Sequence, residues 1–171
     1  LSPLTAEKAD LEEIHRPGFD FHRDGSPWKD YVETIEKISE SKIKNEQQFE
    51  RVGASELRFE SFDIAKLAAG GVMCGIDYVK ENNALAAVVL NRPPGHLANN
   101  TICIFNNIAV GAHYALNKYD IERILIVDCD AHHGKHTQQV FYRSPKVVYF
   151  SMHIDGEYAK ESGMVENDGE E

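Results

Sequence analysis

The chain has 171 residues, of which 42% are hydrophobic, so it is long enough to form one domain around a single core. Its 28 acidic and 18 basic residues give a formal net charge of −10, which argues against a nucleic-acid surface, since phosphates attract positive charge. No apolar stretch approaches the roughly 20 residues that cross a bilayer, and no N-terminal targeting signal is visible. We expect a cytoplasmic protein, or a nuclear one in a eukaryote, with no direct nucleic-acid or membrane partner.

The cysteines Cys74, Cys103 and Cys129 are odd in number and form no CxxC pair. A disulfide framework and a thiolate zinc site are therefore not expected. Because free cysteine is among the most buried residue types, we expect all three to be small core residues in a reducing compartment.

The first 60 residues are polar and mixed, and they contain one predicted amphipathic helix, over residues 28–44. The preceding residues 15–27 are rich in proline and glycine, which indicates a loop. The chain becomes more apolar from residue 61, where a helix is predicted over residues 61–82. Residues 1–60 are thus expected to be a polar helical and loop region, and residues 61–171 the α/β core of the same domain.

Short apolar strands are predicted at residues 84–91, 123–128 and 146–153. Helices are predicted between them, one in residues 101–119 that starts near Phe105 and one over residues 136–142. Apolar strands that alternate with helices are typical of a parallel sheet with helices on both faces. The predicted fold class is therefore α/β, with three layers in the order α/β/α.

A polar segment follows each predicted strand: RPPGH at 92–96, DCDAHHG at 128–134 and SMHIDGEY at 151–158. In an open parallel sheet, functional groups collect in the loops at the carboxyl ends of the strands. We therefore expect these segments to meet at one edge of the sheet and to form the functional site.

The segment DCDAHHG contains candidate metal ligands. Asp128, Asp130 and His132 are spaced two residues apart, and alternate residues at the end of a strand point the same way. Carboxylate and imidazole groups are ordinary ligands of zinc, iron and manganese. Asp130 and His132 are the candidate ligand pair, although a solvated loop could have the same sequence. His133 either supports the ligands or is a packed histidine.

The prolines before His96 fix a rigid turn, and a histidine held in this way suits acid–base chemistry. An ordinary turn followed by an incidental histidine is the alternative. Four other histidines have no obvious partner and are expected to be structural or surface residues: His15, His22, His113 and His136.

The ordered motifs VVLNRPPGH (88–96), CIFNNIAVGA (103–112) and ILIVDCDAHHGKHTQQVFY (124–142) resemble the zinc-dependent histone deacetylase family. This family includes the acetylpolyamine amidohydrolases and has the arginase–deacetylase fold. The resemblance extends over roughly residues 55–171. It implies that residues 1–171 are the N-terminal and central part of a deacetylase domain, whose substrate is an acetylated lysine in a protein or an acetylpolyamine.

The resemblance also implies roles for single residues. Asp130 and His132 match two ligands of a catalytic Zn²⁺, for which Fe²⁺ is an alternative. His96 matches a catalytic histidine, and Asp128 matches the aspartate that supports it. His133 matches the histidine that follows the ligand without binding the metal.

Two sites for monovalent cations are implied as well. The first is a structural K⁺ site, matched by Asp128, Ser151, Met152 and the carbonyl of His132. The second is a peripheral site, matched by Phe141, Ser144 and Val147. In addition, Tyr158 lies near an aromatic position of the family's acyl-lysine tunnel.

The sequence departs from the family pattern at the groups that transfer protons. A second histidine, the general base, usually follows His96, and Leu97 occupies that position. Lys135 and His136 replace the residues that usually follow the ligand motif. Because the chain between PPGH and CIFNN is also short, either the site is altered or a loop after His96 is missing from the sequence. The family's third zinc ligand and transition-state tyrosine have no counterpart in this chain.

Three functions remain open. The favoured one is a zinc-dependent hydrolase that removes acetyl or acyl groups from acylated lysine or polyamine. The alternative is a catalytically impaired, deacetylase-like binding scaffold, which Leu97 and Lys135 favour. Less favoured is an arginase-type ureohydrolase, which shares the fold but lacks PPGH and binds two manganese ions. An oligomer is compatible with all three.

Overall fold

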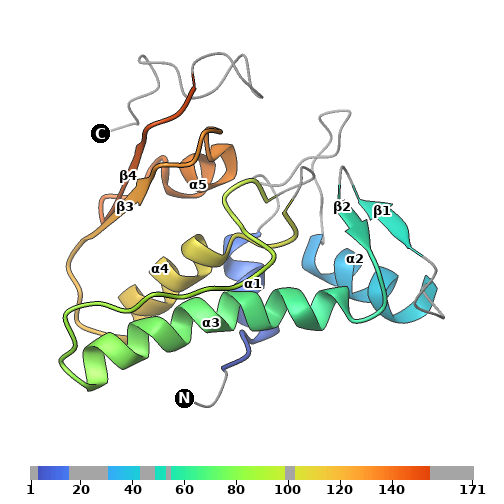
Figure 1. The fold of residues 1–171 in the computed structure, drawn as a ribbon, viewed down its shortest axis with the longest axis horizontal. Helices are drawn as coiled ribbons and strands as arrows, with labels where there is room; N and C mark the ends of the chain where they lie inside the picture. Colours follow the sequence, from blue (N-terminus) through green and yellow to red (C-terminus); the bar gives the residue numbers. More distant parts are fainter. Residues whose placement is uncertain (1–3, 16–30, 43–48, 53–54, 99–102, 155–171) are drawn as a thin grey trace.

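The computed structural model describes residues 4–15, 31–42, 49–52, 55–98 and 103–154. Its longest element is α3 (Ser61–Glu81), which confirms the helix predicted over residues 61–82 (Figure 1). Asp63 in its first turn and Lys80 in its last complement the helix dipole. Gly70 lets the N-terminal segment cross the helix, because a Cβ here would lie 2.1 Å from the Leu4 carbonyl oxygen.

One hydrophobic core lies between α3 and three other helices: α1 (Lys8–Ile14), α2 (Tyr31–Lys37) and α4 (Asn107–Lys118). Phe105 is fully buried in this core. Its ring packs edge-on against the rings of Phe62 and Tyr31, with centroid distances of 5.9 and 6.3 Å. Helix α2 continues as a turn of π-helix, η1 (Ile38–Lys42), so the helix predicted over residues 28–44 is present where the chain is described. The helix predicted to start near Phe105 begins at Asn107, because Asn106 caps it.

The strands β1 (Glu50–Val52) and β2 (Ser55–Leu57) form an antiparallel pair that the sequence analysis did not predict. Val52 and Leu57, at the ends of the pair, are buried. Strands of three residues contain too little alternation for a recognisable pattern.

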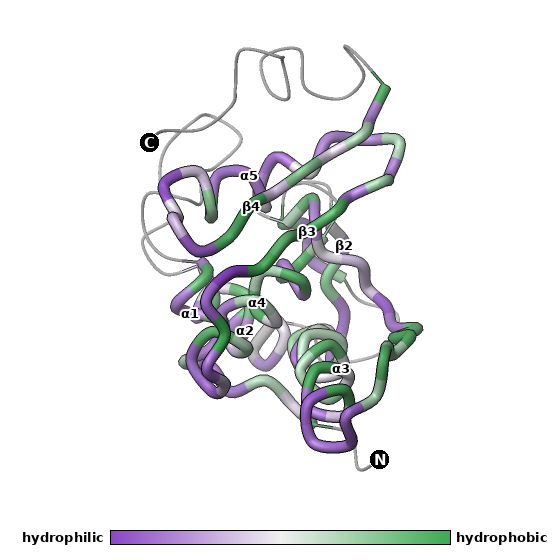
Figure 2. Tube along the Cα trace, turned by 90° about the vertical axis from the view of Figure 1, so that its left-hand side faces the viewer, coloured by the Kyte–Doolittle hydropathy of each residue, from purple (hydrophilic) through white to green (hydrophobic). Residues whose placement is uncertain are grey.

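The strands β3 (Ile124–Asp128) and β4 (Val147–Ser151) pair in parallel, with Ile124 opposite Val147 and Asp128 opposite Ser151. Helix α5 (Lys135–Phe141) connects them, so two predicted strands and the helix between them are confirmed. One face of this pair packs on α4 through Ile126 and Val147. On the other face four hydrophobic side chains are exposed: Leu125, Val127, Val148 and Phe150. Figure 2 shows the hydrophobic character of both strands.

The strand predicted at residues 84–91 is not formed within the described part of the chain. These residues run extended along α3 (Figure 1), with Val89 against Gly71 and Gly75. Residues 85–91 make no backbone hydrogen bond to another described residue, and a strand exists only through such pairing. Val88 and Leu90 are 85% and 93% exposed. Among the described residues, the segment 84–91 therefore adds no third strand to the β3–β4 pair.

The cysteines differ in burial. Cys103 is buried as expected, and Cys74 is half-buried. Cys129 is exposed, so the prediction was wrong for this residue, which follows β3 where the described chain provides no covering layer. None of the described helices combines the length and apolarity needed to cross a bilayer.

A polar cluster joins α3 to α4 around Asp77. Its carboxylate accepts hydrogen bonds from the hydroxyls of Tyr114 and Tyr119, at 2.8 and 2.7 Å, and from the Lys118 ammonium at 2.9 Å. Burial raises the pKa of Asp77, but these hydrogen bonds outweigh burial and hold the pKa below its ordinary value. The ionised carboxylate therefore stabilises the packing of the two helices.

The substitution Asp77→Asn should lower the free energy of unfolding by about 1–2 kcal/mol at pH 7, since hydrogen bonds to a charged acceptor are lost. A carboxylate with a lowered pKa in the folded state stabilises the protein above its unfolded-state pKa, and this contribution disappears as the pH falls through its folded-state pKa. Urea unfolding at pH 7 and at about pH 3 should therefore show a smaller difference between wild type and variant at the lower pH. Glu122→Gln, at an exposed site, is the control. Equal differences at both pH values would contradict this role of Asp77.

Candidate active site

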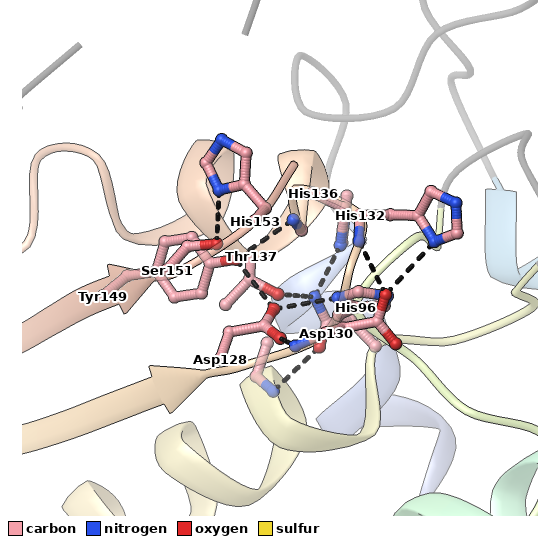
Figure 3. A network of polar contacts seen from close by, with 12 residues as sticks. His96, Asp128, Asp130, His132, His136, Thr137, Tyr149, Ser151 and His153 are labelled. Atoms are coloured by element: carbon pink, nitrogen blue, oxygen red, sulfur yellow. Dashed lines mark hydrogen bonds and ion pairs between the residues drawn. The ribbon is translucent and has the colours of Figure 1, made fainter. Parts of the chain in front are cut away.

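The structure brings the RPPGH turn to the carboxyl end of the β3–β4 pair (Figure 3). His96 Nδ1 lies 2.8 Å from Asp128 Oδ2, which joins the end of the turn to the last residue of β3. The turn itself is tied to α4, because the side-chain amide of Asn107 donates to the Pro93 carbonyl at 2.7 Å. The predicted site residues of these two segments are therefore neighbours.

Asp128 is fixed through both carboxylate oxygens. Oδ1 accepts the backbone amide of Asp130 at 3.1 Å, and Oδ2 accepts the Tyr149 hydroxyl at 2.8 Å as well as the hydrogen bond with His96. Burial raises the pKa of Asp128, but these hydrogen bonds outweigh burial and hold it below its ordinary value. Asp128 is thus an ionised, largely buried acceptor.

His96 is the partner that this carboxylate orients. The hydrogen bond with Asp128 raises the pKa of His96, and burial opposes the shift without cancelling it. His96 Nε2 lies 3.7 Å from Asp130 Oδ1, so the second ring nitrogen is directed toward the candidate metal ligands. The histidine therefore connects Asp128 with the Asp130–His132 pair.

Asp130 and His132 lie on the turn after β3, and the side-chain atoms that could coordinate a metal are adjacent (Figure 3). Asp130 Oδ1 accepts the backbone amide of His132 at 2.8 Å and lies 3.2 Å from its Nδ1. Two ligands of a tetrahedral Zn²⁺, each about 2.1 Å from the ion, would be about 3.4 Å apart, so the pair has a suitable spacing. The side chains are 50% and 38% exposed, which leaves them open to an ion.

This pair alone does not complete a zinc site, which requires at least three protein ligands. The described residues contain no group of three or more His, Cys, Asp or Glu side chains that could hold a metal ion. The chemistry of Asp130 and His132 fits zinc, and any third ligand comes from outside the described residues.

A cavity of about 590 Å³ opens beside these groups. His96, Asp128, Asp130 and His132 contribute to its polar side, and Val72 and Ile108 contribute to its apolar side. Its volume is in the range of small-molecule sites, and its mixture of apolar walls with a few polar groups is typical of them.

The predicted K⁺ contacts are close together. Asp128 and Ser151 are paired in the sheet, and the Met152 amide donates to the Asp128 carbonyl at 2.9 Å. The second set surrounds the turn between α5 and β4, where the Ser144 amide donates to the Phe141 carbonyl and the Ser144 hydroxyl accepts the Val147 amide. Both cation sites stay predictions, and Tyr158 lies outside the described residues.

His133 is buried and packs against aromatic rings. Its ring centroid lies 4.7 Å from that of His153 and 6.2 Å from that of Tyr149. Burial, together with the charge of His153, lowers the pKa of His133 to about 4, so the ring is neutral at neutral pH. Its supporting role beside His132 stays a prediction.

The residues that depart from the family pattern occupy three different environments. Leu97 is 4% exposed and packs with Ala98 and Cys103 at the wall of the cavity. Lys135 is exposed at the start of α5. His136 is 2% exposed and lies in the core, where it stacks on His15 at 4.8 Å.

Tyr149 and Gly134 also belong to the site, although no motif of the sequence indicates a role for either. Tyr149 lies between Val147 and Ser151 in the alternation of β4, so it shares a side of the strand with both. Its hydroxyl accepts the Gly134 amide at 3.1 Å, and burial followed by the bond to Asp128 raises the pKa of Tyr149. The period of two could have indicated that Tyr149 faces the site with Ser151.

The chain belongs to the histone deacetylase family, because the family's domain matches residues 3–171. It is 45% identical over 98 residues to the rat polyamine deacetylase HDAC10, 34% over 158 residues to the mouse polyamine deacetylase HDAC10, and 35% over 130 residues to the Caenorhabditis elegans histone deacetylase 6. These alignments cover 55%, 90% and 72% of this chain, but only 17%, 22% and 14% of the relatives. The chain therefore corresponds to a small part of each relative's length.

The crystal structure of the HDA15 HD domain is similar in fold, with a TM-score of 0.81 at 24% sequence identity. The match covers the whole of this chain and 45% of that chain. The fold is thus the α/β fold of the arginases and deacetylases, as the sequence resemblance implied.

Proposed function

We propose that this protein acts as a zinc-dependent hydrolase. It would remove acetyl or other acyl groups from acylated lysine in a protein or from an acylated polyamine. The observation that carries the proposal is the His96–Asp128 pair directed at the adjacent donors of Asp130 and His132. Relatives named as polyamine and histone deacetylases support this substrate class. A cytoplasmic or nuclear location and the two monovalent-cation sites belong to the same proposal.

Asp130 and His132 would hold Zn²⁺, or Fe²⁺ as the alternative, together with a ligand from outside the described residues. When bound, such an ion polarises an amide carbonyl and makes a coordinated water acidic enough to attack at neutral pH. His96 holds a proton on Nδ1 against Asp128, which leaves Nε2 to accept or donate a proton on the side of Asp130. Because Asp128 is ionised, it stabilises positive charge on this imidazole.

A second candidate function is a deacetylase-like scaffold that binds acylated ligands without hydrolysing them. The observation that favours it is the position after His96, where Leu97 is buried against Cys103 and offers no proton-transfer group. In this case the cavity would still accept an acyl chain through its apolar wall.

Metal content is the first test of the proposal. Zinc should bind with a stoichiometry near one per chain, and the substitutions Asp130→Ala and His132→Ala should each weaken binding at least tenfold, since each removes a ligand. Zinc competition with a chromophoric chelator measures this, and Asp120→Ala, an exposed carboxylate, is the matched control.

Acetate release from an acetyl-lysine peptide and from N-acetylputrescine, measured on the same preparation, separates the candidates. Turnover of either substrate supports the hydrolase, whereas substrate binding without turnover supports the scaffold. Two manganese ions per chain would indicate a ureohydrolase and would contradict both.

A further inference from the structure

We propose that Tyr149 is a positioning residue that fixes the Asp128 carboxylate toward His96 and couples it to the turn that carries the candidate metal ligands. The inference concerns a residue outside the predicted site and rests on the proposed function only where turnover is concerned. The Tyr149 hydroxyl donates to the Asp128 carboxylate at 2.8 Å and accepts from the Gly134 amide at 3.1 Å, and the Ser151 side chain contacts it as well.

The position of Tyr149 follows from the register of the sheet. Asp128 lies opposite Ser151, so Tyr149, two positions earlier on β4, is on the same side of the sheet and two pairs away along the register. A tyrosine ring is long enough to span this distance along the sheet and to place its hydroxyl at the carboxylate. Figure 3 shows the ring of Tyr149 extending toward Asp128 from its own strand.

The hydroxyl restricts the rotation of the carboxylate. The Asp130 amide holds Oδ1 at 3.1 Å, and Tyr149 holds Oδ2, so donors on both oxygens fix the carboxylate plane. His96 then meets an acceptor that is already oriented, and its proton is held on Nδ1. This is the tautomer that leaves Nε2 free to face Asp130.

The second hydrogen bond gives the hydroxyl a defined direction. Because the Gly134 amide is a donor, the Tyr149 oxygen must accept from it, and the hydroxyl proton is directed to Asp128. Gly134 directly follows His132 and His133, so the same side chain ties the ligand turn to the carboxylate. We therefore place Tyr149 as a residue that acts through Asp128.

The first test measures the tautomer of His96 in the wild type and in Tyr149→Phe. The method is ¹⁵N NMR of the histidine side chains, at a pH where His96 is neutral. The wild-type chain should show the Nδ1–H form, and the variant should shift toward the Nε2–H form that free imidazole prefers. Tyr142→Phe is the matched control, since it removes a hydroxyl from a partly exposed residue at the end of α5 that belongs to neither segment of the site. An unchanged His96 tautomer in Tyr149→Phe would overturn the proposal.

The second test is a double-mutant cycle on turnover, combining Tyr149→Phe with Asp128→Asn. Tyr149→Phe alone should lower kcat about tenfold with little change in KM, since one hydrogen bond to a charged group is lost. In the Asp128→Asn background it should have almost no further effect. Additive losses would contradict action through Asp128.

The two tests separate this inference from the proposed function. The tautomer does not depend on turnover, so a wild-type protein that releases no acetate contradicts the hydrolase while the NMR result still decides the role of Tyr149. The amide ¹H–¹⁵N spectrum of Tyr149→Phe should match the wild type away from β4, which distinguishes a positioning role from unfolding.

Discussion

The substitution Gly134→Ala should disable the His96–Asp128 pair while the protein stays folded. A Cβ at this position would lie 2.4 Å from the Tyr149 hydroxyl oxygen, 2.7 Å from Asp128 Oδ2 and 3.1 Å from His96 Nδ1. These atoms are the ends of side chains that can move, so the backbone does not have to. Their displacement, however, breaks the hydrogen bonds that orient His96.

We expect Gly134→Ala to lower kcat/KM for the acetylated substrate by about 100-fold, the size of a typical acid–base contribution. Urea unfolding should show a much smaller change in stability than in activity. Ala131→Ser adds one heavy atom to an exposed position of the same turn and should leave kcat/KM within about twofold. Wild-type activity in Gly134→Ala would mean that the His96–Asp128 contact is not required.

The substitution Asn106→Ala should cause the largest loss of stability among the polar residues of the core. Asn106 is fully buried, and its side-chain oxygen caps α4 by accepting the Ala109 amide at 3.1 Å. Its amide group contacts His136 Nδ1 at 3.1 Å and the Thr137 hydroxyl at 3.0 Å. Alanine removes the cap and both contacts, and it adds no group that replaces them.

The expected loss is about 3 kcal/mol, from roughly 1 kcal/mol for the cap and 1–3 kcal/mol for the buried polar groups that lose a partner. Urea denaturation followed by circular dichroism measures it. Asn117→Ala on the same helix removes only an exposed contact with His113 and should cost under about 0.5 kcal/mol. Similar losses in both variants would show that the buried network does not stabilise the core.

The sequence predicted those elements whose signals are local. The helix over residues 61–82 and the strands at 123–128 and 146–153 were found because their periodicity and apolar runs are long enough to recognise. The extended segment at 84–91 has the same apolar pattern, yet it forms no ladder among the described residues. A strand depends on a neighbour, and the sequence of the strand alone does not contain that neighbour.

The candidate site was predictable in part. His96, Asp128, Asp130 and His132 are predicted from their motifs, and the structure places the first two 2.8 Å apart although His96 follows an extended segment outside the β3–β4 pair. Tyr149 belongs to no motif, and its contact with Asp128 depends on strand register and on the length of one side chain. Such contacts are properties of the packed structure.

The buried position of His136 could not be derived from local sequence either. It follows an exposed lysine in a short helix, where a surface position would be equally consistent with the pattern. Only the packing of α5 against the start of α4 places it beside Asn106 and on His15.

We propose that His96, oriented by Asp128, acts on a substrate held beside Asp130 and His132. The most direct measurement is the rate of acetate release from an acetyl-lysine peptide by zinc-loaded wild type and His96→Ala, with bound zinc determined in both. We expect unchanged zinc and a rate lower by a factor of about 10²–10⁴ in the variant. Equal rates in the two proteins would contradict it.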